Sequence, residues 1–179
     1  MTLSLERRDG RPLRIGHRGA QALAPENTLA SFRAAIEVGV DLIEFDVLSL
    51  REGDLVVAHS NDLFEVSHGA TRGTVRDRSL ASLRSVAPDL PTLDEALAFF
   101  VDEAPDVGVH LDLKTQSAVR GVEAALARHG LLGRTLVSAF DFGSLRRLAR
   151  ADSGVLTGLS GGSTYLGRGS YPSFSNTVE

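Results

Sequence analysis

The chain has 179 residues, a formal net charge of −4 and no cysteine. This length suits one domain with a buried core. The charge argues against a nucleic-acid or anionic-membrane binder, and the lack of cysteine excludes disulfides and thiolate metal sites. The N-terminus lacks the apolar core of a signal peptide, and no apolar run approaches the length of a bilayer span. We therefore expect a cytoplasmic protein without membrane insertion.

Short strands and amphipathic helices alternate along the sequence. A strand at 13–16 leads to a helix with Asn27 as its N-cap and Gly39 as its end, and a capping-box pattern at 92–95 opens a later helix that ends near Pro105. This alternation predicts an α/β fold on a largely parallel sheet. The remaining strands are expected at 40–50, 55–59, 107–114, 135–140 and 155–159, and the remaining helices at 118–129 and 142–150.

The last residues lose this alternation. Residues 161–179 are rich in glycine and serine, which is typical of a loop or a disordered tail. A single domain is accordingly expected over residues 1–160.

Two carboxylates stand out in the strand at 40–50. Glu44 and Asp46 share one face of the strand by its two-residue period, while Ile43, Phe45 and Val47 take the other face. Two buried carboxylates repel each other and are costly to desolvate unless positive charge lies between them. Salt bridges to arginines are one explanation, and a divalent cation held by the pair is the one we favour.

A tight hairpin is expected between the strands at 40–50 and 55–59, because the link is too short for a helical crossover. If Glu52 and Gly53 form a two-residue loop, His59 lies directly across from Asp46 on the same face. This register predicts a histidine beside the two carboxylates.

The strand at 107–114 repeats the polar alternation. His110, Asp112 and Lys114 take one face, although both faces of a parallel strand are normally apolar. Asp112 is a candidate third oxygen ligand, and Lys114 and Arg18 are candidate cations for an anionic group. His110 either belongs to this site or is a packed, hydrogen-bonded core residue.

Oxygen ligands without cysteine favour a hard cation, Mg²⁺ or Ca²⁺, over zinc. A metal, two histidines and two basic side chains in one pocket suit the hydrolysis of a phosphate ester. The ion and the basic groups hold the phosphate, one histidine deprotonates the nucleophile, and the other protonates the leaving oxygen.

Six segments in a fixed order, over roughly residues 13–160, carry a family resemblance: GHRGA…APENTLASF, GVDLIEFDV, LVVAH, LPTLDEAL, LDLK and SAFD. This set resembles the glycerophosphodiester phosphodiesterases, within the phospholipase-C-like phosphodiesterase barrels. The resemblance implies a (β/α)₈-type TIM barrel with the site at the carboxyl ends of the strands. It also implies metal-dependent hydrolysis of a small-molecule glycerophosphodiester to an alcohol and glycerol 3-phosphate.

The resemblance further implies a role for each candidate residue. These are acid–base catalysis by His17 and His59, metal binding by Glu44, Asp46 and Asp112, phosphate binding by Arg18 and Lys114, and loop-fixing or site-lining roles for Glu26 and Asn27.

Three departures from the family pattern bear on this prediction. Asp112 stands where the family usually has Glu, so Asp112→Glu is expected to preserve or improve metal binding and activity. Ser60 follows His59 where the family commonly has Asp. About six strands precede the tail, so the barrel is expected to be incomplete at its C-terminal end. The alternative function is that of a truncated or degenerate family member without catalytic activity, acting as a binding or partner-dependent protein.

Overall fold

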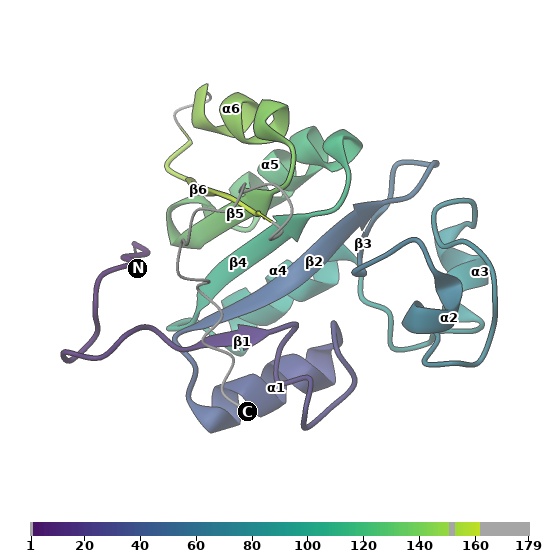
Figure 1. Ribbon diagram of the computed structural model, residues 1–179, viewed down its shortest axis with the longest axis horizontal. Coiled ribbons are helices and arrows are strands. Elements are labelled where there is room, and N and C mark those ends of the chain that lie inside the picture. Colours follow the sequence, from purple (N-terminus) through teal and green to yellow (C-terminus); the bar gives the residue numbers. More distant parts are fainter. Residues whose placement is uncertain (1, 151–152, 162–179) are drawn as a thin grey trace, which may run out of the picture.

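The fold is one sheet covered by helices. The structure is a computed structural model and describes residues 2–150 and 153–161. Within these residues five parallel strands lie in the order β1-β2-β4-β5-β6, and β3 pairs with β2 in the antiparallel direction (Figure 1). The strands are β1 (Ile15–His17), β2 (Leu42–Ser49), β3 (Leu55–Val57), β4 (Gly108–Leu113), β5 (Thr135–Ala139) and β6 (Leu156–Leu159).

The helices fall between the strands as the sequence predicts, with two additions. The described α-helices are α1 (Leu29–Val38), α2 (Leu63–Val66), α3 (Leu80–Arg84), α4 (Leu93–Asp102), α5 (Val119–Arg128) and α6 (Phe142–Arg150). Short 3₁₀ turns, η1 and η2, cover Gln116–Ala118 and Leu132–Arg134. The sequence did not predict α2 and α3. The predicted tail lies almost entirely outside the described residues, and the prediction of one domain over 1–160 stays a prediction.

Helix α1 begins one residue later than expected. Its N-cap is Thr28, whose hydroxyl accepts from the N–H of Ser31, while the Ser31 hydroxyl accepts from the N–H of Thr28. Gly39 ends the helix as predicted, with a φ of 81° that favours glycine. Asn27 is therefore not the cap, because the reciprocal Thr28–Ser31 bonds already satisfy the first turn.

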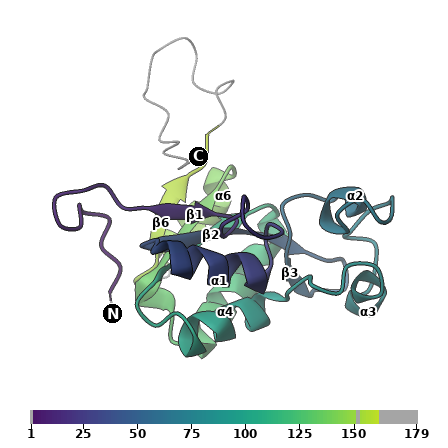
Figure 2. The ribbon, with the colours of Figure 1, turned by 90° about the horizontal axis from the view of Figure 1, so that it is seen from below.

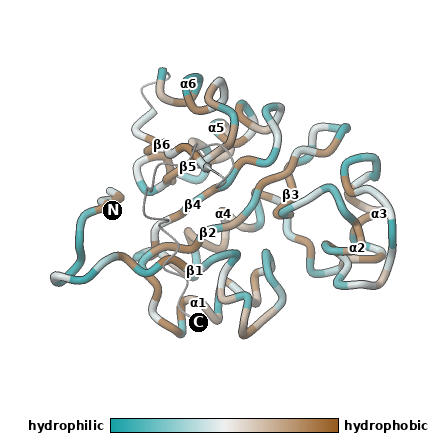
Figure 3. Tube along the Cα trace, viewed as in Figure 1, coloured by the Kyte–Doolittle hydropathy of each residue, from teal (hydrophilic) through white to brown (hydrophobic). Residues whose placement is uncertain are grey.

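One face of the sheet carries the apolar core. Phe45 on β2 lies 5.1 Å from the ring of Phe32 on α1 and 5.7 Å from that of Phe100 on α4, centroid to centroid. Figure 2 shows α1 and α4 together on one side of β1 and β2. Figure 3 colours the chain by hydropathy, and in the central strands β2 and β4 hydrophobic residues alternate with hydrophilic ones. This core confirms that alternate residues of β2 face the helices, which leaves Glu44 and Asp46 on the other face.

The hairpin register differs from the expected one. Val47 pairs with Val57 and Ser49 with Leu55, so the residue opposite Asp46 is Ala58, whose N–H donates to the Asp46 carbonyl at 3.1 Å. The reason is a three-residue loop, 51–53, which Gly53 closes at a φ of 105°. The predicted pairing of His59 with Asp46 is wrong, because His59 follows β3 in the connecting loop.

A small lobe follows β3. Helices α2 and α3 lie beyond the end of β3, to one side of the sheet (Figure 1). They pack Leu63 and Leu83 against Leu48 and Val56 in a second apolar cluster. This lobe holds the loop that carries His59 against the carboxyl end of the sheet.

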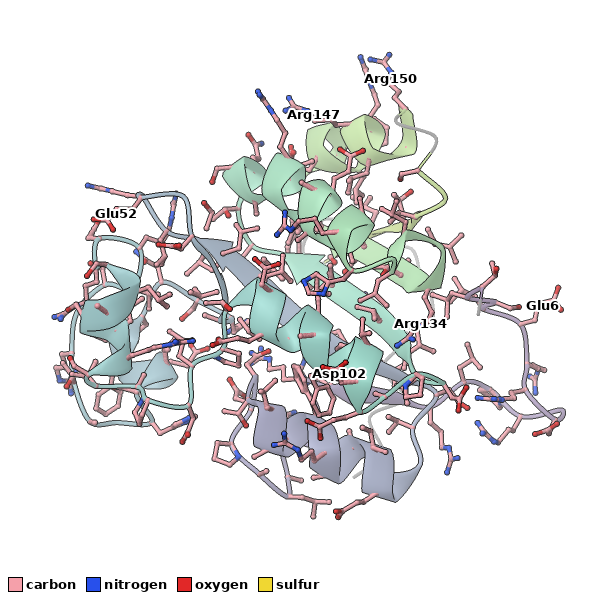
Figure 4. All side chains as sticks on the ribbon, turned by 180° about the vertical axis from the view of Figure 1, so that it is seen from behind. Glu6, Glu52, Asp102, Arg134, Arg147 and Arg150 are labelled. Carbon is pink, nitrogen blue, oxygen red and sulfur yellow. The ribbon has the colours of Figure 1, made fainter. Side chains whose placement is uncertain are left out.

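Arginine side chains make hydrogen bonds near the amino ends of the strands. Asp41, directly before β2, accepts from both guanidinium groups of Arg8 and Arg11 and from the N–H of Arg14. Arg134, labelled in Figure 4, donates to the carbonyl of Phe100 in α4 and to those of Ala104 and Pro105, which follow the helix. On α6, Arg147 and Arg150 point outward (Figure 4).

Candidate functional site

Three carboxylates meet on the polar face of the sheet. Glu44 and Asp46 project from β2, and Asp112 projects from β4, where the register sets it directly beside Asp46. All three residues are buried, with 7%, 1% and 7% of their surface exposed in that order. The structure thus brings together the three predicted metal ligands at the carboxyl half of the sheet.

Lys114 supplies positive charge between two of them. Its Nζ lies 2.8 Å from Asp46 Oδ1 and 2.5 Å from Asp112 Oδ2. Arg18 Nε lies 3.2 Å from Asp46 Oδ2, an ion pair without hydrogen-bond geometry. In this arrangement the described residues contain no group of three histidine or acidic side chains placed to hold a metal ion.

Glu44 is left without a cationic partner of its own. Burial, and then the negative charges of Asp46 and Asp112, raise the pKa of Glu44 to about 8, although the N–H of Arg18 donates to it at 2.9 Å. Its carboxyl group therefore keeps its proton to higher pH than an exposed glutamate does. Even without Glu44, the carboxyl groups of Asp46, Asp112 and Glu26 outnumber the two nearby cations, Arg18 and Lys114.

Asp112 is held by more than Lys114. Its Oδ1 accepts from the hydroxyls of Ser138, at the carboxyl end of β5, and Ser160, which follows β6, at 2.5 and 2.6 Å. Burial alone would raise the pKa of Asp112, but the hydrogen bonds from Lys114 and these hydroxyls lower it. Sequence reasoning missed both serines, although the even spacing of Ser138 along its strand could have placed it on the polar face.

His110, on the polar face of β4, is partly exposed and is linked to the site through Ser138. Its Nε2 lies 3.0 Å from the hydroxyl of Ser138, and burial lowers its pKa to about 4. The Ser138 hydroxyl already donates to Asp112, so the histidine donates to the serine oxygen. The choice between the two roles that the sequence left open for His110 stays a prediction.

The loop after β1 wraps over the carboxylates. Arg18 donates to Glu26 at 2.7 Å, and Asn27 donates to Asp46 Oδ2 at 2.8 Å while accepting from the N–H of Asp46 at 3.2 Å. Arg18 and Asn27 have φ angles of 52° and 57°, a region that non-glycine residues seldom occupy. Glu26 and Asn27, the residues predicted to fix the loop and line the site, thus contact Arg18 and Asp46, respectively.

The two candidate acid–base histidines have different partners. His17, at the end of β1, has Nδ1 3.0 Å from the amide nitrogen of Gln21 and Nε2 3.9 Å from Glu44 Oε2. Burial, and then the charge of Arg18, lowers the pKa of His17, and His59 contributes in the same direction. His59 has Nδ1 2.8 Å from Glu65 Oε1. The sequence did not identify Gln21 or Glu65.

A cavity of about 70 Å³ lies beside His59. Its walls come from the loop after β1, the end of β3, helix α2 and the segment after α3, with Glu26, Asn27, His59, Glu65 and Asp89 among the polar lining residues. The cavity places one histidine of the pair next to space for a small group.

Comparison with known proteins decides the family. The sequence model of the glycerophosphoryl diester phosphodiesterase family matches residues 17–169. The chain belongs to this family. A glycerophosphodiester phosphodiesterase of Caldanaerobacter subterraneus subsp. tengcongensis is 29% identical over 161 residues, which cover 81% of this chain and 65% of that protein.

Solved structures of the family share the fold. The glycerophosphodiester phosphodiesterase of Thermotoga maritima matches with a TM-score of 0.72 at 27% identity, over 86% of this chain and 64% of that one. A phosphodiesterase of Oleispira antarctica, in complex with the product sn-glycerol-3-phosphate, matches with a TM-score of 0.69 at 25% identity, over 83% and 65%. These relatives are TIM barrels, and the described residues form part of such a barrel, with five parallel strands and the antiparallel β3.

The chain covers only part of its relatives. It spans 59%, 65% and 48% of the lengths of three curated family members that it matches. No helix in the described ranges is both long enough and apolar enough to cross a bilayer.

Proposed function

We propose that this chain carries the active site of a glycerophosphodiester phosphodiesterase, which hydrolyses a glycerophosphodiester to an alcohol and glycerol 3-phosphate. The observation that carries the proposal is the convergence of His17, three buried carboxylates and two cations at the carboxyl end of one parallel sheet. Family membership supplies the reaction class, and the residue roles proposed below are those that the resemblance implies.

The reaction needs one proton acceptor and one proton donor. Water loses a proton to one histidine and attacks phosphorus, while the bond from phosphorus to the alcohol oxygen breaks and the other histidine protonates that oxygen. We assign these two roles to His17 and His59. Arg18 and Lys114 offset charge on the phosphate, and Glu26 and Asn27 hold the loop that positions Arg18.

We also propose that Glu44, Asp46 and Asp112 hold a divalent cation, Mg²⁺ or Ca²⁺. The chemistry of the donor set fits such an ion, because all three groups are carboxylates and hard cations prefer oxygen ligands, whereas in the metal-free arrangement Lys114 lies between Asp46 and Asp112. The raised pKa of Glu44 supports the same conclusion, since the site lacks enough positive charge to keep all its carboxyl groups ionised. When bound, the ion would supply Lewis-acid stabilisation of the phosphate oxygens.

The decisive experiment is hydrolysis of glycerophosphocholine by residues 1–179, with and without chelator. His17→Ala and His59→Ala should each lower kcat by about 10² to 10⁴-fold. His129→Ala is the matched control, because His129 pairs with Asp94 at the outer end of α5 and should retain activity. Folded protein without chelator-sensitive turnover would overturn the proposed activity.

A non-catalytic binding role is the second candidate. The bridging position of Lys114 between Asp46 and Asp112 favours it, because an ammonium group there neutralises two proposed ligands without a metal. Calorimetric titration separates the two functions. Binding of Mg²⁺ or Ca²⁺ that is lost in Asp46→Asn supports the enzyme, whereas equal heats for wild type and Glu44→Gln/Asp46→Asn contradict the metal assignment.

A further inference from the structure

The two histidines of the candidate site differ in the hydrogen bond made at Nδ1. A neutral imidazole has one N–H and one acceptor nitrogen, and the bond at one nitrogen fixes the state of the other. His17 Nδ1 faces the amide nitrogen of Gln21, which can only donate, so its proton lies on Nε2. His59 Nδ1 faces the carboxylate of Glu65, which accepts, so its proton lies on Nδ1.

We infer that Glu65 is a positioning residue for His59: its carboxylate holds the ring in the Nδ1–H tautomer and leaves Nε2 as the proton acceptor. This inference rests on the proposed function and deepens it, because it divides the two proton-transfer roles. His59 accepts the proton of the attacking water, and His17, with its proton on Nε2, donates to the leaving alcohol oxygen. The proton gained at His59 Nε2 balances the one lost at His17 Nε2.

The surroundings of Glu65 support this role. Its Oε1 is 2.8 Å from His59 Nδ1, and its Oε2 accepts from the hydroxyl of Ser60 at 2.8 Å. Both carboxylate oxygens are therefore committed, which fixes the plane of the group relative to the ring. His59 and Ser60, which are adjacent in the loop, therefore share one acidic partner, and it comes from α2. Glu65 also lines the same cavity as His59.

The competing explanation is that Glu65 only stabilises α2, since an acidic residue in the first turn suits a helix N-terminus. Asp62 offers a matched control for this. It is the N-cap of the same helix, its Oδ1 accepts from the N–H of Phe64 at 2.9 Å, and it makes no bond to His59. Asp62→Ala therefore weakens α2 and removes one negative charge while leaving the Glu65–His59 contact in place.

The test reads the tautomer directly, without substrate or metal. Ring ¹⁵N chemical shifts of His59 are measured at alkaline pH, where imidazole is neutral, in wild type, Glu65→Met, Glu65→Gln and Asp62→Ala. Wild type and Asp62→Ala should show the proton on Nδ1. Glu65→Met removes the acceptor and should shift the population toward Nε2–H, while Glu65→Gln keeps an oxygen acceptor and should retain Nδ1–H. An unprotonated Nδ1 in wild type, or the same tautomer in Glu65→Met, would overturn the inference.

Turnover provides the second readout. Glu65→Met should lower kcat by about 10- to 100-fold with little change in KM, as when carboxylates that orient functional histidines are removed. Glu65→Gln should recover part of that loss, and Asp62→Ala should stay near wild type. A loss in Asp62→Ala equal to that in Glu65→Met would reduce Glu65 to a helix-stabilising role. If the tautomer behaves as expected and wild type shows no turnover, the proposed function fails and the positioning by Glu65 stands.

Discussion

The pKa values of buried carboxyl groups are shifted in opposite directions at the two ends of the parallel sheet. At the amino end, Asp41 is surrounded by donors, and its hydrogen bond with Arg11, helped by those from Arg14 and Arg8, holds its pKa well below its usual range. At the carboxyl end, burial and neighbouring carboxylates raise the pKa of Glu44 to about 8. Both residues lie on or beside the same strand, three positions apart.

This difference separates a structural charge from a functional one. The amino end has more donors than its carboxylate needs, so ionised Asp41 stabilises the fold. The carboxyl end has more carboxyl groups than its cations can satisfy, so ionised Glu44 destabilises it. Sites that bind ligands commonly carry such unsatisfied charge.

The largest effect is expected for Asp112→Glu. The side chain of Asp112 is matched to three donors, Lys114, Ser138 and Ser160, and a longer carboxylate would displace them in a packed site. We expect the free energy of unfolding to fall by about 2 to 4 kcal/mol, from overpacking and lost charged hydrogen bonds. Chemical denaturation followed by circular dichroism measures this, with Asp112→Asn as the control that keeps the size.

The outcome of Asp112→Glu also decides between two expectations. The family resemblance alone implies that Glu restores the commoner ligand length. The hydroxyl contacts imply that this site is built around the shorter side chain. Asp112→Asn should lose less stability, because its amide oxygen can still accept from both serines. Wild-type stability and improved metal binding in Asp112→Glu would favour the expectation from the family.

Glu44→Gln should stabilise the metal-free protein. A carboxyl group whose pKa rises from 4.5 to about 8 on folding holds its proton longer in the folded state. The free energy of unfolding of wild type therefore falls as pH rises from about 4.5 to about 8, and the amide avoids this loss. Thermal melts in the presence of chelator should give the variant a higher free energy of unfolding than wild type. The difference should be roughly 1 to 3 kcal/mol at pH 8 and smaller at pH 5. A constant difference across this range would contradict the assignment.

Asp41→Asn should change the free energy of unfolding in the opposite direction to Glu44→Gln. Because the folded-state pKa of Asp41 lies below its usual 3.8, its contribution is fully present above that value and is lost as pH falls through the folded-state pKa. At neutral pH the variant should lose about 1 to 2 kcal/mol of stability, since weaker amide contacts replace charged hydrogen bonds. The melting curves of the two proteins should approach each other below pH 4. Equal stability at pH 7 would remove the contrast between the two ends.

Much of the fold could be predicted from the sequence, because local patterns determine it. Within the described residues, the alternation of apolar residues predicted the position of each strand. The capping box at Thr92 and the glycine at 39 predicted one end each of two helices. The short helices α2 and α3 escaped prediction because four or five residues carry too little periodicity. The hairpin register failed by one residue because Gly53 allows a three-residue loop as readily as a two-residue one.

Only part of the candidate site could be predicted from the sequence. Glu44, Asp46, Asp112 and Lys114 could be placed together, since strand period and register bring them to one face. Glu65, Gln21 and Ser160 could not, because each reaches the site from a separate turn or helix whose position depends on tertiary packing. Such supporting residues have no motif of their own.

The smallest effect is expected when the ion pair of Arg33 with Glu103 is broken. This pair can be compared directly with the pair of Arg11 and Asp41. Two guanidinium nitrogens of Arg33 lie 2.8 and 2.7 Å from the Glu103 carboxylate, much like the 2.6 and 3.0 Å contacts of Arg11 with Asp41. The geometries match, but the Glu103 side chain is 44% exposed and that of Asp41 only 5%.

Exposed pairs gain little because water screens them and both side chains lose conformational freedom. Glu103→Gln should therefore have the same melting temperature as wild type, and added salt should not separate the two melting temperatures. Arg33→Met should show a slightly larger loss, since the Arg33 guanidinium also lies over the ring of Phe99 at 5.5 Å. If Glu103→Gln instead destabilises the protein as much as Asp41→Asn does, bond geometry rather than burial governs the amino end, and the comparison with Glu44 loses its basis.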